Sequence, residues 1–228
     1  EAKAHYVYAA ATFPEFRGRG CMTSLLGFAA ELGAARGQAY SVVLPAHEGL
    51  VPLYEKAGYA PFFSVTQETA DARLISANAS PPAPGRRLAS FSQLCARRRE
   101  VLSERPGSVL WDENAFFYAA ESARVYGGKL LVCGEGETLS WALCGMADGC
   151  CEVAEWMAHP AKKAELLGLL LRACPAPSCR FRLPAGGEPL FSGSERSERP
   201  FGMLRALGEN ALPAVFPERP PYLGLSLD

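Results

Sequence analysis

The sequence predicts an α/β (α+β) protein built from two related units. Strand-like and helix-like segments alternate along the chain, which is the pattern of helices packed on a sheet. A weak internal repeat relates the two halves. Residues 76–85 (SANASPPAPG) are rich in Pro, Ala and Ser, the composition of a linker. We therefore expect a first domain over residues 1–75 and a second over residues 86–228.

The first domain contains apolar runs that alternate between strand and helix spacing. Between Gly20 and Gly37, apolar residues recur at helical spacing, and Gly37 supplies a stop signal. The short run before Pro45 is bounded like a buried strand. The predicted elements are a strand at 5–12, a helix between Gly20 and Gly37, a strand at 39–44, a short helix at 50–57, and strands at 59–66 and 72–75.

The second domain shows the same kind of alternation beyond the linker. Helical spacing is predicted at 88–102, 113–126 and 161–174, and strands at 129–133, 139–146, 150–157 and 179–183. The polar segment 186–200 is predicted as a loop. Residues 201–207 and 222–227 are expected to close the sheet.

The internal repeat consists of a strand, a proline, a helix, a strand and the letters Leu-Pro-Ala. It occurs with Pro14 and residues 44–46, and again with Pro160 and residues 183–185. The second copy is shorter and has no Gly-rich turn before its helix, so we interpret it as a related unit without the ligand loop. Chance similarity stays open as an alternative because strand–helix–strand units are common.

The charge balance argues against several kinds of partner. Lys and Arg total 23 against 24 Asp and Glu, a net charge of -1, whereas nucleic-acid-binding proteins usually carry a basic face. Hydrophobic residues make up 49% of the chain, but no apolar run is long enough to cross a bilayer. We therefore expect a cytoplasmic protein that binds neither nucleic acid nor membrane. The sequence leaves the oligomeric state open.

The eight cysteines lack CxxC pairs, so we interpret them as small buried hydrophobic residues of a protein in a reducing compartment and expect no metal. The less favoured alternative is a zinc site. Its potential ligands are Cys144, Cys150, Cys151, Cys174, Cys179 and His159.

The segment with the clearest chemistry is FPEFRGRGCMT, residues 13–23. Gly18 and Gly20 allow the backbone to approach a bulky anion closely. The helix that follows presents free N–H groups and partial positive charge at its first turn, which suits a diphosphate. Arg17 and Arg19 add guanidinium groups for further phosphate oxygens.

Residues 17–22 (RGRGCM) resemble the [Gln/Arg]-x-x-Gly-x-[Gly/Ala] motif of GNAT-type N-acetyltransferases, which holds the pyrophosphate of acetyl-CoA. Met22 departs from the Gly or Ala of the motif, which we expect to alter helix packing more than anion binding. The cofactor-binding residues that the resemblance implies here are Arg17, Gly18, Arg19, Gly20, Cys21, Met22 and Thr23. P-loop and Rossmann units place their glycines differently.

Residues 53–59 (LYEKAGY) resemble the "LYEKxGF" element of the same family. The resemblance implies that Tyr54 is the general acid that protonates the departing CoA thiolate, since a phenol with a pKa near ~10 is protonated at neutral pH. The alternative is an ordinary core tyrosine on a short helix. The resemblance also implies that the backbone of Ala10, Ala11 and Thr12 binds the pantetheine arm, although a plain sheet strand fits these letters equally well.

The resemblance implies a GNAT-like fold with a mixed, mostly antiparallel central sheet and flanking helices. It further implies an acetyl-CoA-dependent N-acetyltransferase in which a small-molecule or peptide amine attacks the thioester directly. Residues 1–75 would be the C-terminal half of the catalytic domain, because a complete GNAT domain has three strands and two helices ahead of this segment. Residues 86–228 would be a second, degenerate GNAT-like domain, as in tandem GNAT proteins.

The general base is not assigned by the sequence. Glu15, His47, Glu48 and the terminal carboxylate of Asp228 are candidates, and each has a simpler structural explanation. The alternative function is a non-catalytic module on a GNAT scaffold that binds acyl-CoA or a protein partner. It is favoured by the GNAT elements missing ahead of this segment, by the unusual Met22 and by the unassigned base.

Overall fold

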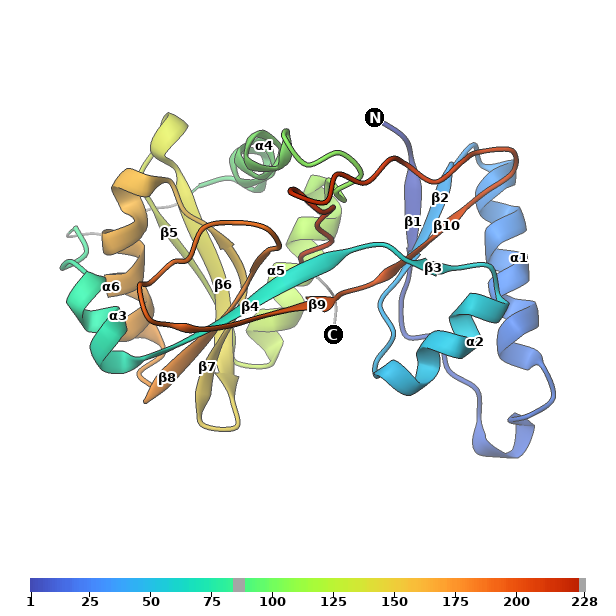
Figure 1. The fold of residues 1–228 in the computed structure, drawn as a ribbon, viewed down its shortest axis with the longest axis horizontal. Helices are drawn as coiled ribbons and strands as arrows, with labels where there is room; N and C mark the ends of the chain where they lie inside the picture. The colour runs from blue at the N-terminus through green and yellow to red at the C-terminus, as the bar shows by residue number, and fades with distance from the viewer. Residues whose placement is uncertain (84–88, 226–228) are drawn as a thin grey trace. The chain divides into compact units, whose positions relative to one another are not determined.

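The computed structural model describes residues 1–83 and 89–225, and the chain folds into two compact units (Figure 1). Unit 1 comprises Glu1–Phe63 and Pro200–Ala214, and unit 2 comprises Ser64–Arg199 and Val215–Leu227. Each unit is thus built from two separate stretches of the chain. These units differ from the expected ranges 1–75 and 86–228, because residues 64–75 lie in unit 2 and residues 200–214 lie in unit 1. The second, degenerate GNAT-like domain stays a prediction.

Unit 1 contains a four-stranded sheet in the order β1-β2-β10-β3 (Figure 1). Strands β1 and β2 are parallel, and β10 is antiparallel to both of its neighbours. The strands are β1 (Ala4–Val7), β2 (Tyr40–Val43), β3 (Ala60–Pro61) and β10 (Met203–Ala206). The helices are α1 (Cys21–Ala35) and α2 (Val51–Lys56), with 3₁₀ turns η1 (Pro14–Phe16) and η2 (Glu48–Leu50).

Strand β1 is shorter than the strand predicted over residues 5–12. Its pairing with β2 stops at Val7, opposite Val43. Ala9 then has a φ of 53°, in the left-handed region where an extended strand cannot continue. Ala10, Ala11 and Thr12 consequently lie outside any strand, on an irregular stretch that leads to η1.

Unit 2 contains a six-stranded sheet in the order β5-β6-β7-β8-β4-β9. Its described pairings are antiparallel except for the parallel pair β7–β8. The strands are β4 (Ser64–Asp71), β5 (Lys129–Cys133), β6 (Ser140–Ala147), β7 (Cys150–Met157), β8 (Ser178–Pro184) and β9 (Glu195–Pro200). The helices are α3 (Ala72–Asn78), α4 (Phe91–Leu102), α5 (Glu113–Val125) and α6 (Lys163–Ala173), with 3₁₀ turns η3 (Gly136–Thr138) and η4 (Pro160–Lys162).

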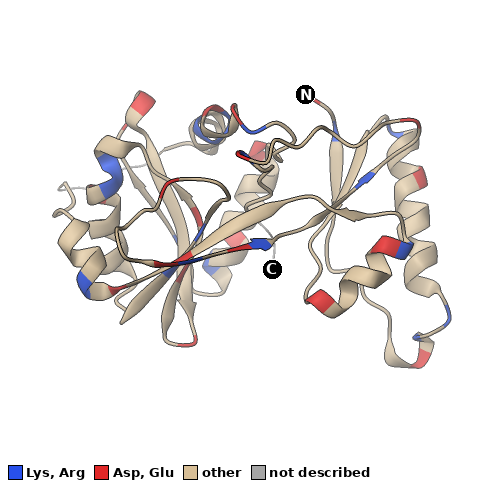
Figure 2. Ribbon diagram, in the orientation of Figure 1, with Lys and Arg blue, Asp and Glu red and all other residues tan. Residues whose placement is uncertain are grey.

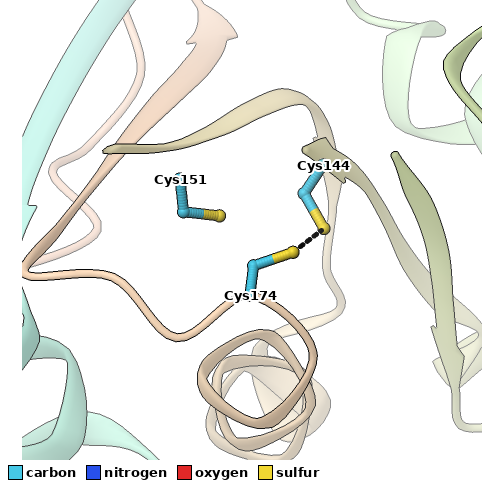
Figure 3. A group of neighbouring side chains, drawn as sticks. All are labelled: Cys144, Cys151 and Cys174. Atoms are coloured by element: carbon cyan, nitrogen blue, oxygen red, sulfur yellow. Dashed lines mark hydrogen bonds between the residues drawn. The ribbon is translucent and has the colours of Figure 1, made fainter. Parts of the chain in front are cut away.

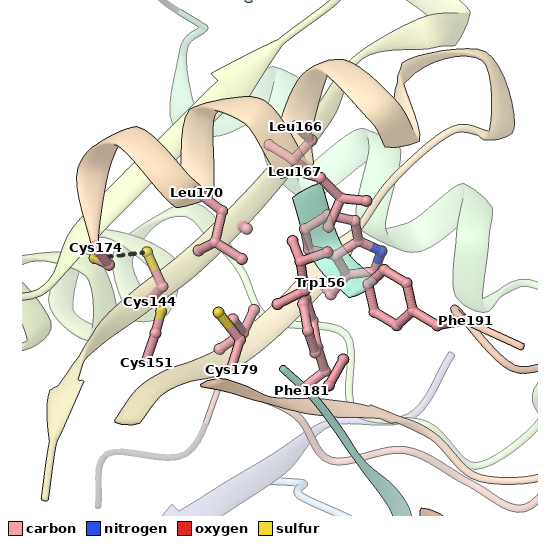
Figure 4. Close-up of a cluster of buried hydrophobic side chains, with 14 of the residues drawn as sticks. Cys144, Cys151, Trp156, Leu166, Leu167, Leu170, Cys174, Cys179, Phe181 and Phe191 are labelled. Carbon is pink, nitrogen blue, oxygen red and sulfur yellow. Dashed lines mark hydrogen bonds between the residues drawn. The ribbon is translucent and has the colours of Figure 1, made fainter. Parts of the chain in front are cut away.

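The core of unit 2 lies between this sheet and α6. Leu166, Leu167 and Leu170 are fully buried and face Trp156 and Phe181 on the sheet (Figure 4). The leucines recur at helical spacing, so one side of α6 is apolar and covers the sheet. Burial of one such side chain stabilises the fold by about 1.5–3 kcal/mol.

Three predictions for unit 2 were wrong. Residues 72–75 are helical, because the Asp71 carboxylate accepts a hydrogen bond from the Leu74 amide (2.7 Å) and caps α3. The predicted loop 186–200 contains β9, an entirely exposed and polar edge strand that apolar alternation does not reveal. Residues 222–225 form no strand, and residues 226–227 of that predicted strand lie outside the described residues.

The internal repeat corresponds to one arrangement that occurs twice. In unit 1, β1, η1, α1 and β2 follow one another, and the two strands pair in parallel. In unit 2, β7, η4, α6 and β8 do the same, and each 3₁₀ turn begins at the proline of the repeat. Descent of both from one ancestral unit stays a prediction.

The fold class is confirmed, since both sheets are mostly antiparallel and helices flank them. Basic and acidic residues are interspersed in each unit (Figure 2). No helix in the described part of the chain is long and apolar enough to span a bilayer.

Candidate active site

The Gly-rich turn of unit 1 leads into an uncapped helix. Gly18 and Gly20 have φ values of 75° and 77°, a conformation that other residues resist. Gly20 is the N-cap of α1, and no side chain hydrogen-bonds the first turn of the helix. The first internal bond runs from the Ser24 amide to the Gly20 carbonyl (3.0 Å). The amides of residues 21–23 therefore point away from the helix as potential anion donors.

The space in front of these glycines is open. A Cβ placed on Gly18 or Gly20 would meet no atom within 4 Å. Arg17 donates from Nε to the Thr12 carbonyl (3.2 Å), and the Arg19 guanidinium lies 5.4 Å from the centre of the Phe16 ring. Both arginines are exposed, so their remaining N–H groups are available to an anion at this helix end.

Helix α2 places Tyr54 in a small apolar cluster. The cluster contains Leu26 of α1, Val43 at the end of β2, and Met22 packed against its edge. Tyr54 is only 5% exposed. Burial, and then the neighbouring Tyr59 phenol, raise the pKa of Tyr54, so it is a protonated donor at neutral pH.

The structure brings the Gly-rich turn and Tyr54 together. It places residues 10–12 outside the strand that was predicted to contain them. Met22 and Tyr54 contact one cluster, so the first turn of α1 and helix α2 meet above the end of β2. Met22 packs against the edge of this cluster, at the position where the motif has Gly or Ala. Cys21 and Thr23 are exposed on the same turn, while Ala10–Thr12 precede it as irregular backbone.

The candidate bases lie on surface turns. Glu15 lies in η1, Glu48 lies in η2, and His47 is the N-cap residue of η2. All three are exposed, and Asp228 lies outside the described residues. The geometry gives none of them a distinguishing partner.

Sequence reasoning did not single out three residues near the end of α2: Ser41, Tyr59 and Arg205. Tyr59 stands in the quoted motif, and its aromatic character was an available signal. Arg205 lies far along the chain, and no local pattern connects it with α2.

The cysteines gather in unit 2 rather than at this site. The Sγ atoms of Cys144, Cys151 and Cys174 all lie within 4.8 Å of one another, and Cys144 and Cys174 are 3.7 Å apart (Figure 3). Three sulfurs at such distances could hold a metal ion. However, a metal needs thiolates, and the hydrogen bond with Cys144, ahead of burial, raises the pKa of Cys151.

The surroundings of these thiols are apolar, since all three cysteines belong to the same buried cluster as Leu170 (Figure 4). A set of thiolates there would place negative charge in a hydrophobic core. The arrangement therefore suits neutral thiols that pack as small hydrophobic side chains. The absence of a metal stays a prediction.

Comparison with known proteins relates both the sequence and the fold to one family. Residues 1–62 match the family described as the acetyltransferase (GNAT) domain. None of the curated proteins compared with this sequence matches it.

Solved structures extend the similarity to most of the chain. A conserved protein of unknown function from Enterococcus faecalis, described as a probable N-acyltransferase, matches with a TM-score of 0.68, 18% identity and coverage of 90% of this chain and 54% of its own. A GCN5-related N-acetyltransferase from Kribbella flavida matches with a TM-score of 0.67 and 17% identity. The match covers 89% of this chain and 52% of that protein. A tandem GNAT protein from the clavulanic acid biosynthesis pathway matches with a TM-score of 0.51 and 15% identity. The match covers 92% of this chain and 77% of that protein.

The chain spans about half the length of the first two of these structures. Identities this low relate folds rather than substrates, while the family match covers the residues that carry the Gly-rich turn and Tyr54. Residues 1–62 are thus similar to the acetyltransferase (GNAT) domain, and most of the chain shares its fold with solved GNAT proteins.

Proposed function

We propose that this chain is part of an N-acyltransferase that transfers the acetyl group of acetyl-CoA to a primary amine. The observation that carries the proposal is the uncapped first turn of α1, which opens onto free space behind two glycines with positive φ. The family match and the exposed Arg17 and Arg19 support it. An uncapped helix end beside two guanidinium groups is a site for a diphosphate.

The cofactor would lie across the two parts of the site. Its diphosphate accepts hydrogen bonds from the amides of residues 21–23. Its pantetheine arm follows the backbone of Ala10, Ala11 and Thr12, which no longer pairs with β2 once the strand has ended at Val7. Backbone groups freed from a sheet can bond an extended ligand as a further strand would.

The chemistry needs positioning and two proton transfers. The neutral amine nitrogen attacks the thioester carbonyl and forms a C–N bond, and the tetrahedral intermediate then breaks its C–S bond. The Tyr54 phenol donates its proton to the departing thiolate, giving CoA-SH, while the amine loses one proton to a base or to water. The Tyr54 phenolate then regains a proton from solvent. The products are the N-acetylated amine and CoA.

Calorimetric titration with acetyl-CoA tests the binding step. Acetylpantetheine is the matched control, because it has the same thioester and arm but lacks the diphosphate. We expect acetyl-CoA to bind at least about tenfold more tightly, equivalent to about 1.4 kcal/mol. Equal affinity for the two ligands, or no binding at millimolar acetyl-CoA, would overturn the proposal.

Release of CoA in the presence of a panel of small amines and peptides tests the transfer step. Acetylated product identified by mass spectrometry is the expected result. Acetyl-CoA binding without transfer to any amine would instead favour the non-catalytic acyl-CoA-binding module.

A further inference from the structure

A buried hydrogen bond fixes the residue that lies against Tyr54. The Tyr59 hydroxyl lies 2.6 Å from the Ser41 hydroxyl. Ser41 is fully buried on β2 and Tyr59 is 3% exposed, so neither group exchanges this bond for one with water. A buried hydroxyl pair is costly to break, because each partner left alone loses about 1–3 kcal/mol of solvation. Tyr59 is therefore held in one orientation relative to the sheet.

The ring of Tyr59 packs against the ring of Tyr54 and so restricts its orientation. The two ring centres are 5.9 Å apart, with an angle of 79° between the ring planes. This edge-to-face geometry is the preferred one for an aromatic pair and is worth about 0.5–1.5 kcal/mol beyond the area it buries. Among the residues that the structure describes, none hydrogen-bonds the Tyr54 hydroxyl, so packing alone orients it.

The backbone between the two tyrosines is held as well. The Tyr59 amide donates to the Tyr54 carbonyl (3.0 Å), across a turn that Gly58 makes with a φ of 83°. Arg205 of β10 donates from Nη1 to the Ala57 carbonyl (2.8 Å). A cation at the C-terminal end of a helix also complements the helix dipole. The end of α2 is thus fixed from β2 and from β10.

We propose that Tyr59, anchored by Ser41, is a positioning residue that sets the direction of the Tyr54 phenol toward the thioester sulfur. This inference rests on the proposed function above. It assigns Tyr59 no contact with substrate. Its role is to reduce the freedom of the Tyr54 side chain, which lies in an apolar cluster.

Kinetic double-mutant cycles test this role. Tyr59→Phe keeps the ring and removes only the hydroxyl, and Ser41→Ala removes the other half of the bond. We expect each to lower kcat about tenfold, with KM for acetyl-CoA unchanged, because misplacement of a reacting group by a fraction of an ångström is costly. The double variant should be no worse than either single one, because both remove the same bond.

The decisive comparison is made in the Tyr54→Phe background. A residue that acts through the Tyr54 hydroxyl has no further effect once that hydroxyl is gone, so Tyr59→Phe should then leave kcat unchanged. Tyr40→Phe is the control, since the Tyr40 hydroxyl bonds the Ala211 carbonyl at an exposed position (3.1 Å). It should leave kcat unchanged in both backgrounds.

A spectroscopic readout works without any acceptor amine. The ultraviolet titration of the protein minus that of Tyr54→Phe reports ionisation of Tyr54 alone. Burial, and then the neighbouring Tyr59 phenol, raise the pKa of Tyr54. The matching difference curve in the Tyr59→Phe background, Tyr59→Phe minus the Tyr54→Phe/Tyr59→Phe double variant, should therefore lie at lower pH. An unchanged curve would overturn the inference.

The outcomes separate the two proposals. A Tyr54→Phe protein with full kcat would overturn the role of Tyr54 and this inference together. Loss of turnover in Tyr54→Phe, combined with a Tyr59→Phe effect that persists in that background, would overturn only this inference. A rise in KM at unchanged kcat would also overturn it, since that result indicates a defect in cofactor binding.

Discussion

Met203 of β10 lies directly opposite Val43 of β2 in an antiparallel pair, although most of unit 2 separates them along the chain. Met203 is 2% exposed and belongs to the cluster that surrounds Tyr54. The candidate active site therefore depends on a strand that arrives late in the sequence. Unit 1 cannot be complete in residues 1–63 alone, since β10 separates β2 from β3 in the sheet.

We predict that Met203→Ala destabilises unit 1. Truncation of a buried Met leaves a cavity and costs about 2–5 kcal/mol. Met146→Ala is the matched control, because Met146 is 50% exposed and should change stability by only about 0.5 kcal/mol. Urea unfolding followed by circular dichroism measures both, and equal effects at the two positions would contradict the placement of β10.

Helix α1 provides a pair of glycines, one at its N-cap and one in its interior, for a test of acetyl-CoA binding. Gly20→Ala forces a Cβ onto a residue with a φ of 77°, at a cost of about 1–2 kcal/mol, and places a methyl group in the open space before the helix. We expect acetyl-CoA affinity to fall about tenfold or more. Gly27→Ala lies in the same helix at an ordinary φ with open space around it. Calorimetry should show it unchanged in affinity and slightly more stable.

The exposed Cys21 reports directly on occupancy of this turn. It lies at the first position of α1, and its thiol is accessible to iodoacetamide. If the diphosphate of acetyl-CoA binds the amides of residues 21–23, saturating acetyl-CoA should slow alkylation of Cys21, as measured by peptide mass spectrometry. Cys95 in unit 2, which is partly exposed, is the internal control. Protection of neither cysteine by acetyl-CoA would contradict this placement.

The pH dependence of turnover follows from the raised pKa of Tyr54. A phenol acts as an acid only while protonated, so activity should persist through the pH at which an ordinary tyrosine ionises, near ~10, and fall only above it. Tyr54→Phe should lower kcat by about 10²-fold or more and abolish this alkaline limb, while acetyl-CoA affinity stays the same. An alkaline limb retained in Tyr54→Phe would assign it to another group.

A buried ion pair holds the last described residues onto unit 2. Arg98 and Glu155 are 2.8 Å apart and 1% and 0% exposed. Glu155 also accepts bonds from the Tyr222 hydroxyl (2.8 Å) and the Leu225 amide (3.0 Å), and Arg98 donates to the Leu223 carbonyl (3.0 Å). This network explains why residues 222–225 are buried without forming a strand.

We predict that Arg98→Ala lowers the stability of unit 2 by about 3–5 kcal/mol, because it leaves the Glu155 carboxylate buried without a counterion. Glu121→Ala breaks the exposed pair with Arg124 and should cost about 0–1 kcal/mol. Urea denaturation compares the two variants. Similar small losses in both variants would contradict a stabilising role for the buried pair of Arg98 and Glu155.

Local sequence determined the parts of this protein whose conformation depends on near neighbours. Two glycines at positive φ and the apolar spacing behind them set the turn and the start of α1. Leu53 to Tyr59 likewise marked the short helix that carries Tyr54. The N-cap of α3 is also a local feature, since Asp71 lies three residues before the Leu74 amide that it binds. This capping signal for a helix was overlooked because residues 72–75 have a strand-like composition.

Tertiary structure alone decided which strands share a sheet. A four-residue strand such as β10 can pair with any free edge, and its partners β2 and β3 are specified by packing around Met203 and by the Arg205–Ala57 bond, not by residues beside it in sequence. The end of β1 at Val7 and the burial of Tyr59 against Ser41 are also non-local. Such contacts form between segments that only the folded chain brings together. The entropy lost when those long loops close is offset by the contacts of the assembled core, not by any one local segment.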